Sequence, residues 1–350
     1  MARPSKAASG PQGIPQEKIS ISVVVPTYRR PHLLLRCLET LCAQNYDPDA
    51  YEVIVVDNAG CSVTRRMVEG FDAGRRGAGP SVRYLLAVES RGPAAARNCG
   101  WLAARGKIIA FTDDDCLPAP DWLRAGAAAF ANGEVGVMGN IVVPVPSAPT
   151  DYELTVAQLG NSEFATANCF YRRDALKAAG GFDERFTAAW REDSDLYFTL
   201  LKGIGNDPFS SPNFRFGYAP EAIVCHPSRE VSWGVSLTQQ RKSMYNALLF
   251  KKHPDHYRAQ IQSSPPWRYY RALLALLGGG IALIRGRTRP AAVMLVLWAV
   301  LTGRFAGERL RHTSRAPQHV AEMVVTSALI PPLSVFWRLV GAIKFRVFFL

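Results

Sequence analysis

Between residues 19 and 111 the chain alternates short apolar runs with longer segments whose apolar residues recur at helical spacing. The apolar runs are rich in Val and Ile and predict buried strands at 19–25, 51–56, 82–88 and 108–111. The intervening segments predict helices at 31–44, 62–71 and 93–105. Strands that are apolar on both faces and separated by helices are typical of parallel sheets. The pattern therefore predicts an α/β fold with a mostly parallel central sheet flanked by helices.

The middle of the chain has a less regular pattern. We expect a helix capped by Asp121 and running to about residue 132, strands at 135–143 and 166–171, and helices at 173–179 and from 190 onward. A proline-rich loop is expected at 144–149 and a short strand at 222–226. Residues 1–18 are rich in Pro, Gly, Ser and Gln without an apolar stretch, so we expect a disordered leader and no signal peptide.

The last part of the chain contains apolar runs at 272–284, 291–302 and 323–337. Each run is shorter than the roughly 20 residues of a spanning helix, and we expect Pro331 and Pro332 to break the third. An aromatic and basic segment at 267–271 precedes them, and a basic turn at 285–290 separates the first two. The pattern favours a re-entrant hairpin or helices lying in a membrane interface. A buried helical subdomain and marginal spanning remain as alternatives.

The distribution of charge along the chain distinguishes a membrane from a nucleic acid as the expected partner. The chain has a formal net charge of +12, and after residue 265 twelve basic residues are opposed only by Glu308 and Glu322. Arginines beside apolar runs are typical of the cytoplasmic face of an anionic membrane, so we expect a membrane partner and no nucleic acid. The seven cysteines form no CxxC pair, which favours reduced thiols in a cytosolic protein over disulfides or a zinc site.

Three consecutive carboxylates, Asp113 to Asp115, follow the predicted strand at 108–111. Like charges this close repel one another unless a cation neutralises them, and Mg²⁺ or Mn²⁺ prefers such oxygen ligands. A solvated acidic turn or a helix cap is the alternative. Thr27, Tyr28 and Asp57 also follow predicted strands. Because ligands bind beyond the carboxyl ends of parallel strands, the coincidence predicts a binding site there.

Four sequence blocks carry a family resemblance. They read VVVPTYRR at 23–30, VVDN at 55–58, ARNCG at 96–100 and FTDDD at 111–115. In order and spacing they resemble the nucleotide-binding half of family 2 glycosyltransferases, which are inverting enzymes of the GT-A fold. The resemblance implies a nucleotide-diphosphate sugar as donor. Many members have Asp-Asp-Gly-Ser where this chain has DNAG at 57–60, so the base of the donor stays open.

The same resemblance implies roles for residues that bind the donor. Pro26, Thr27 and Tyr28 would line the nucleoside pocket, Asp57 would contact the base or ribose, and Arg97 would contact the nucleotide. The alternative for Thr27 and Tyr28 is a plain strand end, and for Arg97 a surface charge on its helix. Asn98 is expected to cap or brace the sheet and not to contact the ligand.

The resemblance also implies a site for Mn²⁺ or Mg²⁺. Asp115 would be the main metal ligand, Asp114 would help through the ribose or a water, and Asp113 would support the loop. His226 ends the strand expected at 222–226, where some family members supply a third metal ligand. A lone histidine with a structural role is the alternative.

A Gly-Gly-Phe-Asp turn at 180–183 also resembles the family, in which such a turn precedes a catalytic helix. That helix begins near Glu192 and Asp193. The resemblance implies that Asp193 is the base that takes the acceptor proton, while Glu192 orients the acceptor or holds the loop. The alternative is that these carboxylates interact favourably with the helix dipole. Asp195 lies two residues further on and is expected to be structural.

These expectations combine into a functional hypothesis. The chain would consist of a leader at 1–18, a donor-binding half at 19–118, an acceptor half at 119–262 and a membrane-associated tail at 263–350. It would transfer a sugar with inversion to a lipid-linked or glycan acceptor at the cytoplasmic face of the membrane, in cell-envelope or polysaccharide synthesis. The alternatives are a non-catalytic sugar-nucleotide-binding protein and a processive polysaccharide synthase. The latter usually has Gln-x-x-Arg-Trp, which QQRK at 239–242 matches only faintly, with no Trp following.

Overall fold

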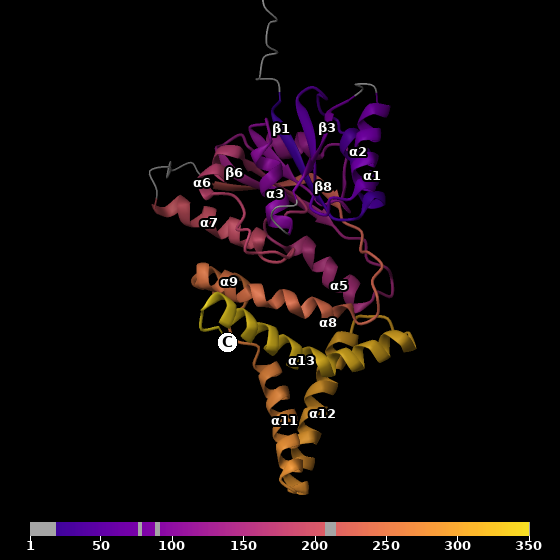
Figure 1. Ribbon diagram of the computed structural model, residues 1–350, viewed down its shortest axis with the longest axis vertical. Helices are drawn as coiled ribbons and strands as arrows, with labels where there is room; N and C mark the ends of the chain where they lie inside the picture. Colours follow the sequence, from indigo (N-terminus) through magenta and orange to yellow (C-terminus); the bar gives the residue numbers. More distant parts are fainter. Residues whose placement is uncertain (1–18, 76–78, 88–91, 207–214, 350) are drawn as a thin grey trace, which may run out of the picture.

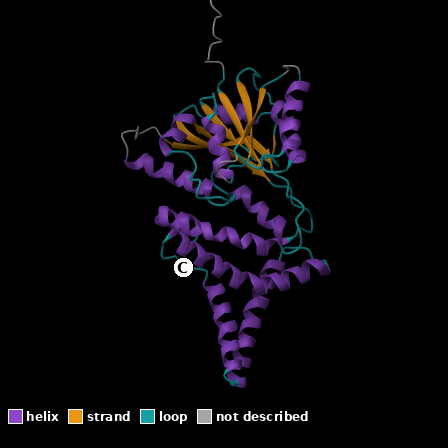
Figure 2. Ribbon diagram, viewed as in Figure 1, coloured by secondary structure: helices purple, strands orange, loops and turns teal. Residues whose placement is uncertain are grey.

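The computed structural model describes residues 19–75, 79–87, 92–206 and 215–349, so the predicted leader lies outside the described residues. One eight-stranded sheet with helices on its faces forms the upper part of the molecule in Figure 1. Helices alone form the lower part, as the colouring of Figure 2 makes plain. The strand order is β3-β2-β1-β4-β7-β6-β8-β5.

The first half of the sheet is parallel, as the apolar runs predict. It contains β1 (Ile21–Thr27), β2 (Tyr51–Asp57), β3 (Ser81–Leu86) and β4 (Ile108–Phe111). Every residue of β1 and β2 is buried, because helices cover both faces. The connecting helices are α1 (Pro31–Cys42), α2 (Ser62–Gly74) and α3 (Pro93–Leu102). Thr27 pairs with Asp57 in the β1–β2 register, so the carboxyl ends of these strands meet at one edge.

The second half of the sheet is mixed. It contains β5 (Leu117–Pro118), β6 (Glu134–Val142), β7 (Cys169–Arg172) and β8 (Arg215–Cys225). Strand β7 runs antiparallel to both β4 and β6, whereas β8 runs parallel to β6. The strand expected at 222–226 is therefore the end of a longer one. Because β4 pairs with β7, one sheet contains strands from both predicted halves of the domain. The boundary between a donor-binding half ending at 118 and an acceptor half beginning at 119 stays a prediction.

The helices of this half differ from the sequence expectations in two places. Helix α4 (Trp122–Ala128) ends before residue 132, and Asp121 accepts hydrogen bonds from the side chains of Asn45 and Arg124 instead of capping the helix. Helix α5 (Asp151–Ala157), just after the proline-rich segment, was not predicted. Its signal is a capping box, in which Thr150 Oγ1 accepts from the Glu153 N–H while Glu153 accepts from the Thr150 N–H.

Helix α6 (Arg173–Ala179) ends at the Gly-Gly-Phe-Asp turn, and α7 (Glu192–Asn206) follows it. A group of helices then lies beneath the sheet in Figure 1. It comprises α8 (Val235–Gln239), the 3-10 turn η2 (Gln240–Ser243), α9 (Met244–Lys252), α10 (Pro254–His256) and the π turn η3 (Tyr257–Ile261). The buried residues Leu248 and Leu249 of α9 pack in one cluster with Phe186 and Phe198 from the α7 region. Helix α9 therefore joins the sheet domain to the tail.

The tail consists of three long helices. Helices α11 (Trp267–Ile284) and α12 (Thr288–Leu310) form a hairpin that projects from the rest of the molecule, and α13 (Pro317–Phe345) lies across its base (Figure 1). Flanking residues extend the first predicted apolar run at its start and the other two at both ends, giving helices of 18, 23 and 29 residues. By length and composition, α12 and α13 are able to cross a membrane, and only 11% of the apolar window of α12 is buried.

The expected break at Pro331 and Pro332 was wrong, because α13 continues through both prolines. A proline inside a helix removes one hydrogen bond and costs about 3 kcal/mol. The helix here is held by tertiary packing: Ile330, Pro331 and Val335 are all buried, and α13 packs along α9. The sequence pattern near the prolines does not show this packing, which compensates for the lost hydrogen bond.

Candidate active site

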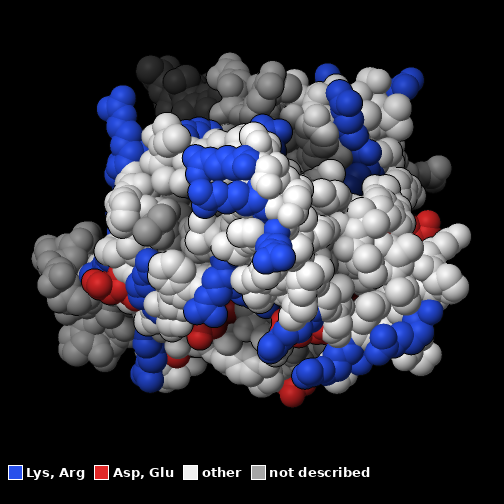
Figure 3. All heavy atoms as spheres, turned by 90° about the horizontal axis from the view of Figure 1, so that it is seen from below, with Lys and Arg blue, Asp and Glu red and all other residues white. Residues whose placement is uncertain are grey.

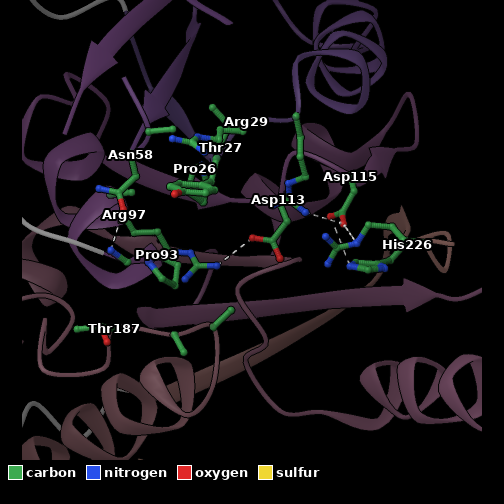
Figure 4. A pocket seen from close by; sticks show the side chains of 18 of the residues that line it. Pro26, Thr27, Arg29, Asn58, Pro93, Arg97, Asp113, Asp115, Thr187 and His226 are labelled. Atoms are coloured by element: carbon green, nitrogen blue, oxygen red, sulfur yellow. Dashed lines mark hydrogen bonds and ion pairs between the residues drawn. The ribbon is translucent and has the colours of Figure 1, made fainter. Parts of the chain in front are cut away.

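A cleft of about 920 Å³ opens at the carboxyl ends of β1, β2 and β4. The predicted residues that line it are Pro26, Thr27, Tyr28, Arg97, Asp113, Asp115 and His226. Figure 4 shows that these side chains come from elements far apart in the sequence, with Arg97 and Asp113 joined across the cleft and Asp115 beside His226. The predicted residues Asp57, Asp114, Glu192 and Asp193 are not part of the lining.

The end of β1 forms one wall of the cleft. Thr27 is buried, and its hydroxyl donates a hydrogen bond of 2.7 Å to Asp114 Oδ2. Tyr28 is half exposed, so its ring is available to a ligand. Arg29 has a φ of 55°, a left-handed conformation that is unfavourable for a side chain of this size and that often occurs at functional sites. This turn redirects the chain so that Tyr28, Arg29 and Arg30 all line the cleft.

Asp57 lies beneath the cleft. Its carboxylate accepts hydrogen bonds from the backbone N–H groups of Ala59 (2.8 Å) and Cys61 (2.7 Å) and from the Tyr84 hydroxyl (2.9 Å). Asp57 thereby holds the loop after β2, and Asn58 and Ala59 of that loop line the cleft. The contact of Asp57 with a base stays a prediction.

Asn58 was missed by sequence reasoning. Its side chain donates to the Ala87 carbonyl and accepts a 2.7 Å hydrogen bond from the Gly92 N–H, so it ties the end of β2 to the start of α3. Its position in the VVDN block was the available signal.

The three carboxylates of the acidic run face different cations. Asp113 Oδ1 lies 2.9 Å from Arg97, Asp114 Oδ1 lies 2.8 Å from Arg30, and Asp115 Oδ2 lies 2.9 Å from Arg229. Arg30 also approaches Asp115 Oδ2 at 3.4 Å. The repulsion that the sequence implied is thus reduced by arginines from separate segments.

Burial and pairing shift these carboxyl groups in opposite directions. Burial alone would raise the pKa of Asp113, but Arg97, together with His226 and Arg30, outweighs it and holds that pKa below its usual range. Burial raises the pKa of Asp114 to about 7, against the opposing effect of Arg30. Asp113 therefore stays charged at the wall of the cleft, whereas Asp114 lies fully buried and is not part of the lining.

Arg97 links the cleft to the start of α7. Its guanidinium is 2% exposed and lies 2.9 Å from both Asp113 Oδ1 and Glu192 Oε1. Burial would lower the pKa of Arg97, but the two carboxylates outweigh it and raise that pKa further. Replacing this cation would leave two acidic groups without their shared partner.

The predicted Glu-Asp pair lies at the first turn of α7. Burial, together with the adjacent Asp193, raises the pKa of Glu192 to about 7. Asp193 is half-buried, and its carboxylate accepts a 2.7 Å hydrogen bond from the Ser194 N–H. Asp195 instead faces α9, where it lies 2.6 Å from Lys252 Nζ and 3.0 Å from His253 Nε2. Its contacts are those of a structural residue.

Asn98 holds the turn that precedes α7. Its side chain donates a hydrogen bond of 2.8 Å to the Phe182 carbonyl and accepts one of 2.9 Å from the Phe182 N–H. Gly181 has a φ of 76°, and a Cβ there would lie 2.6 Å from Asn98 Oδ1. The glycine therefore permits the close contact between α3 and the turn, which places Glu192 beside Arg97.

The donor set around Asp115 fits a divalent cation. Asp115, His226 and Cys116 are all buried, and one ligand atom of each lies within 4.8 Å of the others. Nε2 of His226 lies 3.6 Å from Asp115 Oδ1, while its Nδ1 has no hydrogen-bond partner among the described residues. Cys116 was not predicted, although it follows Asp115 directly.

Two further cleft residues, Arg229 and Arg241, were also missed. Arg229 follows β8, three positions after His226, and contacts Asp115. Arg241 lies on η2. No local pattern places either residue near the acidic run, because each approaches it only through the fold.

Comparisons with known proteins agree with this geometry. A family model described as "Glycosyl transferase family 2" matches residues 22–186, and one described as "Glycosyl transferase family group 2" matches residues 108–340. The fold and site define an enzyme that transfers glycosyl groups. The chain belongs to glycosyltransferase family 2.

Two curated relatives show the extent of the similarity. The glycosyltransferase AglE of Haloferax volcanii is 28% identical over 219 residues, which cover 60% of this chain and 67% of the relative. The succinoglycan biosynthesis protein ExoM of Rhizobium meliloti is 31% identical over 229 residues, covering 62% and 70%.

A solved structure, the mannosyltransferase PcManGT from Pyrobaculum calidifontis in complex with GDP-Man and Mn²⁺, is similar over 95% of this chain and 88% of that one. Its TM-score is 0.53 at 18% identity, a likeness that concerns the fold. It agrees with the predicted GT-A fold.

Proposed function

We propose that this chain transfers a sugar from a nucleotide-diphosphate donor to an acceptor hydroxyl, with inversion and by direct displacement. The single observation that carries the proposal is Arg97, which joins Asp113 in the cleft to Glu192 at the start of α7. It connects the side of the cleft expected to hold the donor to the helix expected to carry the base.

The residues around the cleft support binding of the donor. Tyr28 offers a half-exposed aromatic ring, and the loop held by Asp57 offers Asn58 and Ala59. Arg30, Arg229 and Arg241 bring positive charge to the same space, as a diphosphate requires. The Pyrobaculum calidifontis enzyme, whose structure contains GDP-Man and Mn²⁺, supports a nucleotide sugar as the donor class.

Asp115 and His226 are the residues that would hold a Mn²⁺ or Mg²⁺ ion. When bound there, such an ion supplies positive charge that stabilises the departing diphosphate. Arg97 keeps Asp113 charged and in place, and Arg30 holds Asp114 and Asp115 in their present orientation.

Asp193 is the proposed base. Its carboxylate takes the proton of the acceptor hydroxyl as that oxygen forms a bond to the anomeric carbon and the bond to the diphosphate breaks. The nucleoside diphosphate leaves with the bonding electrons, and no covalent enzyme intermediate forms. Glu192, bound to Arg97, sets the position of the first turn of α7 and hence of Asp193.

The tail supports a membrane-near acceptor, either lipid-linked or a glycan. The hairpin exposes apolar side chains on both helices, among them Leu274 (67%), Ile284 (88%), Val293 (69%) and Val296 (62%). Seen from below in Figure 3, the surface carries many Lys and Arg side chains and few Asp and Glu. We infer that the hairpin enters an anionic bilayer from its cytoplasmic face while α13 lies at the surface. The name of the Rhizobium meliloti relative supports a role in polysaccharide synthesis.

The test uses the full chain in detergent or lipid nanodiscs. A panel of nucleotide sugars is measured by thermal shift with and without Mn²⁺, because a ligand that binds the folded state raises the melting temperature. The stabilising donor is then followed for transfer or slow hydrolysis, and the anomeric configuration of the product is read by NMR. Binding without transfer or hydrolysis would indicate a non-catalytic sugar-nucleotide-binding protein, and a retained configuration would exclude direct displacement.

A further inference from the structure

The tail also contacts a residue that lines the cleft. Trp337 of α13 lies against Arg241 of η2, with the guanidinium carbon 5.7 Å from the ring centroid. This distance is within the range of a cation–π interaction. Arg241 in turn lines the cleft that contains Asp115, His226 and Arg229. Trp337 of the tail is therefore connected to the candidate active site through one residue, Arg241.

The backbone of α13 holds the same region. A Cβ at Gly341 would lie 2.3 Å from the carbonyl oxygen of Met244, so only glycine permits this approach. Met244 is the first residue of α9 and directly follows η2. Gly341 lies about one helical turn after Trp337, so both contacts fall on one face of α13. The turn that carries Arg241 is thus held between the tail and the cleft.

Arg29 and Arg241, two arginines of the cleft, lie on aromatic rings, those of Tyr28 and Trp337. Arg30, Arg97 and Arg229 each pair with a carboxylate of the acidic run. Among the described residues, no carboxylate lies within ion-pairing distance of Arg241, whose side chain remains exposed. A guanidinium that lies on an aromatic ring and faces a cleft keeps its donors free for an anion.

We propose that Trp337 is a positioning residue for the transfer reaction: it holds Arg241 in the wall of the cleft, where the guanidinium binds a phosphate group of a substrate. The inference rests on the proposed function and adds a role for the tail beyond attachment to a membrane. Phosphate occurs both in the diphosphate of the donor and in the head of a lipid-linked acceptor. The experiment distinguishes these two sources.

The variants are Trp337→Ala, Trp337→Phe, Arg241→Ala and the double variant Trp337→Ala with Arg241→Ala. Leu339→Ala is the matched control, because Leu339 also lies on α13 and is 47% exposed. Melting temperatures identify any variant that has lost its fold. Dissociation constants are measured for UDP and GDP with Mn²⁺, and separately for farnesyl phosphate in micelles. The kcat and KM for the donor are measured with the nucleotide sugar that wild type uses.

Loss of one charged hydrogen bond corresponds to roughly a tenfold change in affinity or more. We expect Trp337→Ala and Arg241→Ala to weaken binding of the same probe by roughly this factor. The double variant should bind that probe no more weakly than Arg241→Ala does. If binding of UDP or GDP is weaker and the KM for the donor is raised, Arg241 binds the diphosphate of the donor. If binding of farnesyl phosphate is weaker, Arg241 binds the phosphate of a lipid-linked acceptor. Trp337→Phe should recover most of the loss, because it retains an aromatic face.

Three results would overturn the proposal: unchanged binding of both probes in Arg241→Ala, unchanged binding in a folded Trp337→Ala, or fully additive effects in the double variant. Failure of the proposed function is seen separately, in wild type, as absence of both nucleotide binding and transfer.

Discussion

Arg97 Nη1 and Glu192 Oε1 lie 2.9 Å apart although the two residues are 95 positions apart in the sequence. The pair is buried, and Arg97 also binds Asp113 in the cleft. A buried ion pair of this kind contributes little net stability but is costly to break, because the remaining charge is left without a partner. The pair therefore matters most for the relative position of the acidic run and α7.

The first prediction concerns Arg97. Replacing it by Ala should lower the free energy of unfolding by about 3 kcal/mol, the typical cost of removing one partner from a buried pair. It should also abolish transfer, because Asp113 and Glu192 lose their shared cation. Arg65→Ala is the control, since Arg65 pairs with Glu69 on the exposed surface of α2 and should have almost no effect. Wild-type transfer by Arg97→Ala would show that the link is not required.

The second prediction concerns the base. Asp193→Asn should bind the nucleotide sugar and Mn²⁺ normally in a thermal-shift assay, while transfer falls by at least about a hundredfold. Asp195→Asn is the matched control on the same helix: it should lower the melting temperature, because Lys252 and His253 lose a buried partner. If Asp195→Asn stops transfer and Asp193→Asn does not, the assignment of the base is wrong.

The third prediction concerns pH. Burial raises the pKa of Glu192 to about 7, so in the folded state this group gains a proton as the pH falls below about 7. The charges facing it are Arg97, Asp193 and Lys242. A raised carboxyl pKa favours the folded state at low pH, and this contribution is lost as the pH rises from the unfolded value near 4.5 through about 7.

Wild type should therefore lose stability relative to Glu192→Gln over that pH interval, as measured by denaturant unfolding. Transfer should show the opposite trend, because the Arg97–Glu192 pair needs the charged carboxylate. A constant stability difference between the two proteins from pH 4.5 to 8 would contradict this account.

The fourth prediction concerns the metal. Asp115→Asn and His226→Ala should each weaken Mn²⁺ binding at least about tenfold, as measured by EPR titration without substrate. Asp114→Asn should bind Mn²⁺ nearly as wild type, because Asp114 lies behind the cleft in contact with Thr27 and Arg30. His32→Ala, at an exposed position of α1, is the histidine control. Equal affinity in wild type and in both ligand variants would place the ion elsewhere.

The fifth prediction concerns the hairpin. Val293→Asp together with Val296→Asp places two charges on exposed apolar positions of α12 and should strongly reduce cosedimentation with phosphatidylglycerol vesicles. Val231→Asp, at an exposed position outside the hairpin, should leave vesicle binding unchanged. Undiminished binding by the double variant would mean that α12 does not enter the bilayer.

The sequence by itself determined the parts of the fold that depend on local pattern. The first four strands and the helices between them follow from apolar runs and helical spacing, which depend on near neighbours in the chain. The same patterns placed the acidic run and Thr27 at strand ends, and parallel pairing then brings such ends to one edge of a sheet. The resemblance added Arg97 and His226 to that edge, where the structure has them.

The tertiary structure alone decided what depends on distant partners. The carboxylate of Asp114 lies behind the cleft in contact with Arg30 and Thr27 from another segment, and Asp57 accepts from Tyr84 of β3 as well as from nearby backbone N–H groups. Helix α13 runs through Pro331 because its burial against other helices offsets the lost hydrogen bond. The contact of Trp337 with Arg241 joins residues 96 positions apart (337 less 241). Such contacts form only when the chain folds back on itself, so no local pattern contains them.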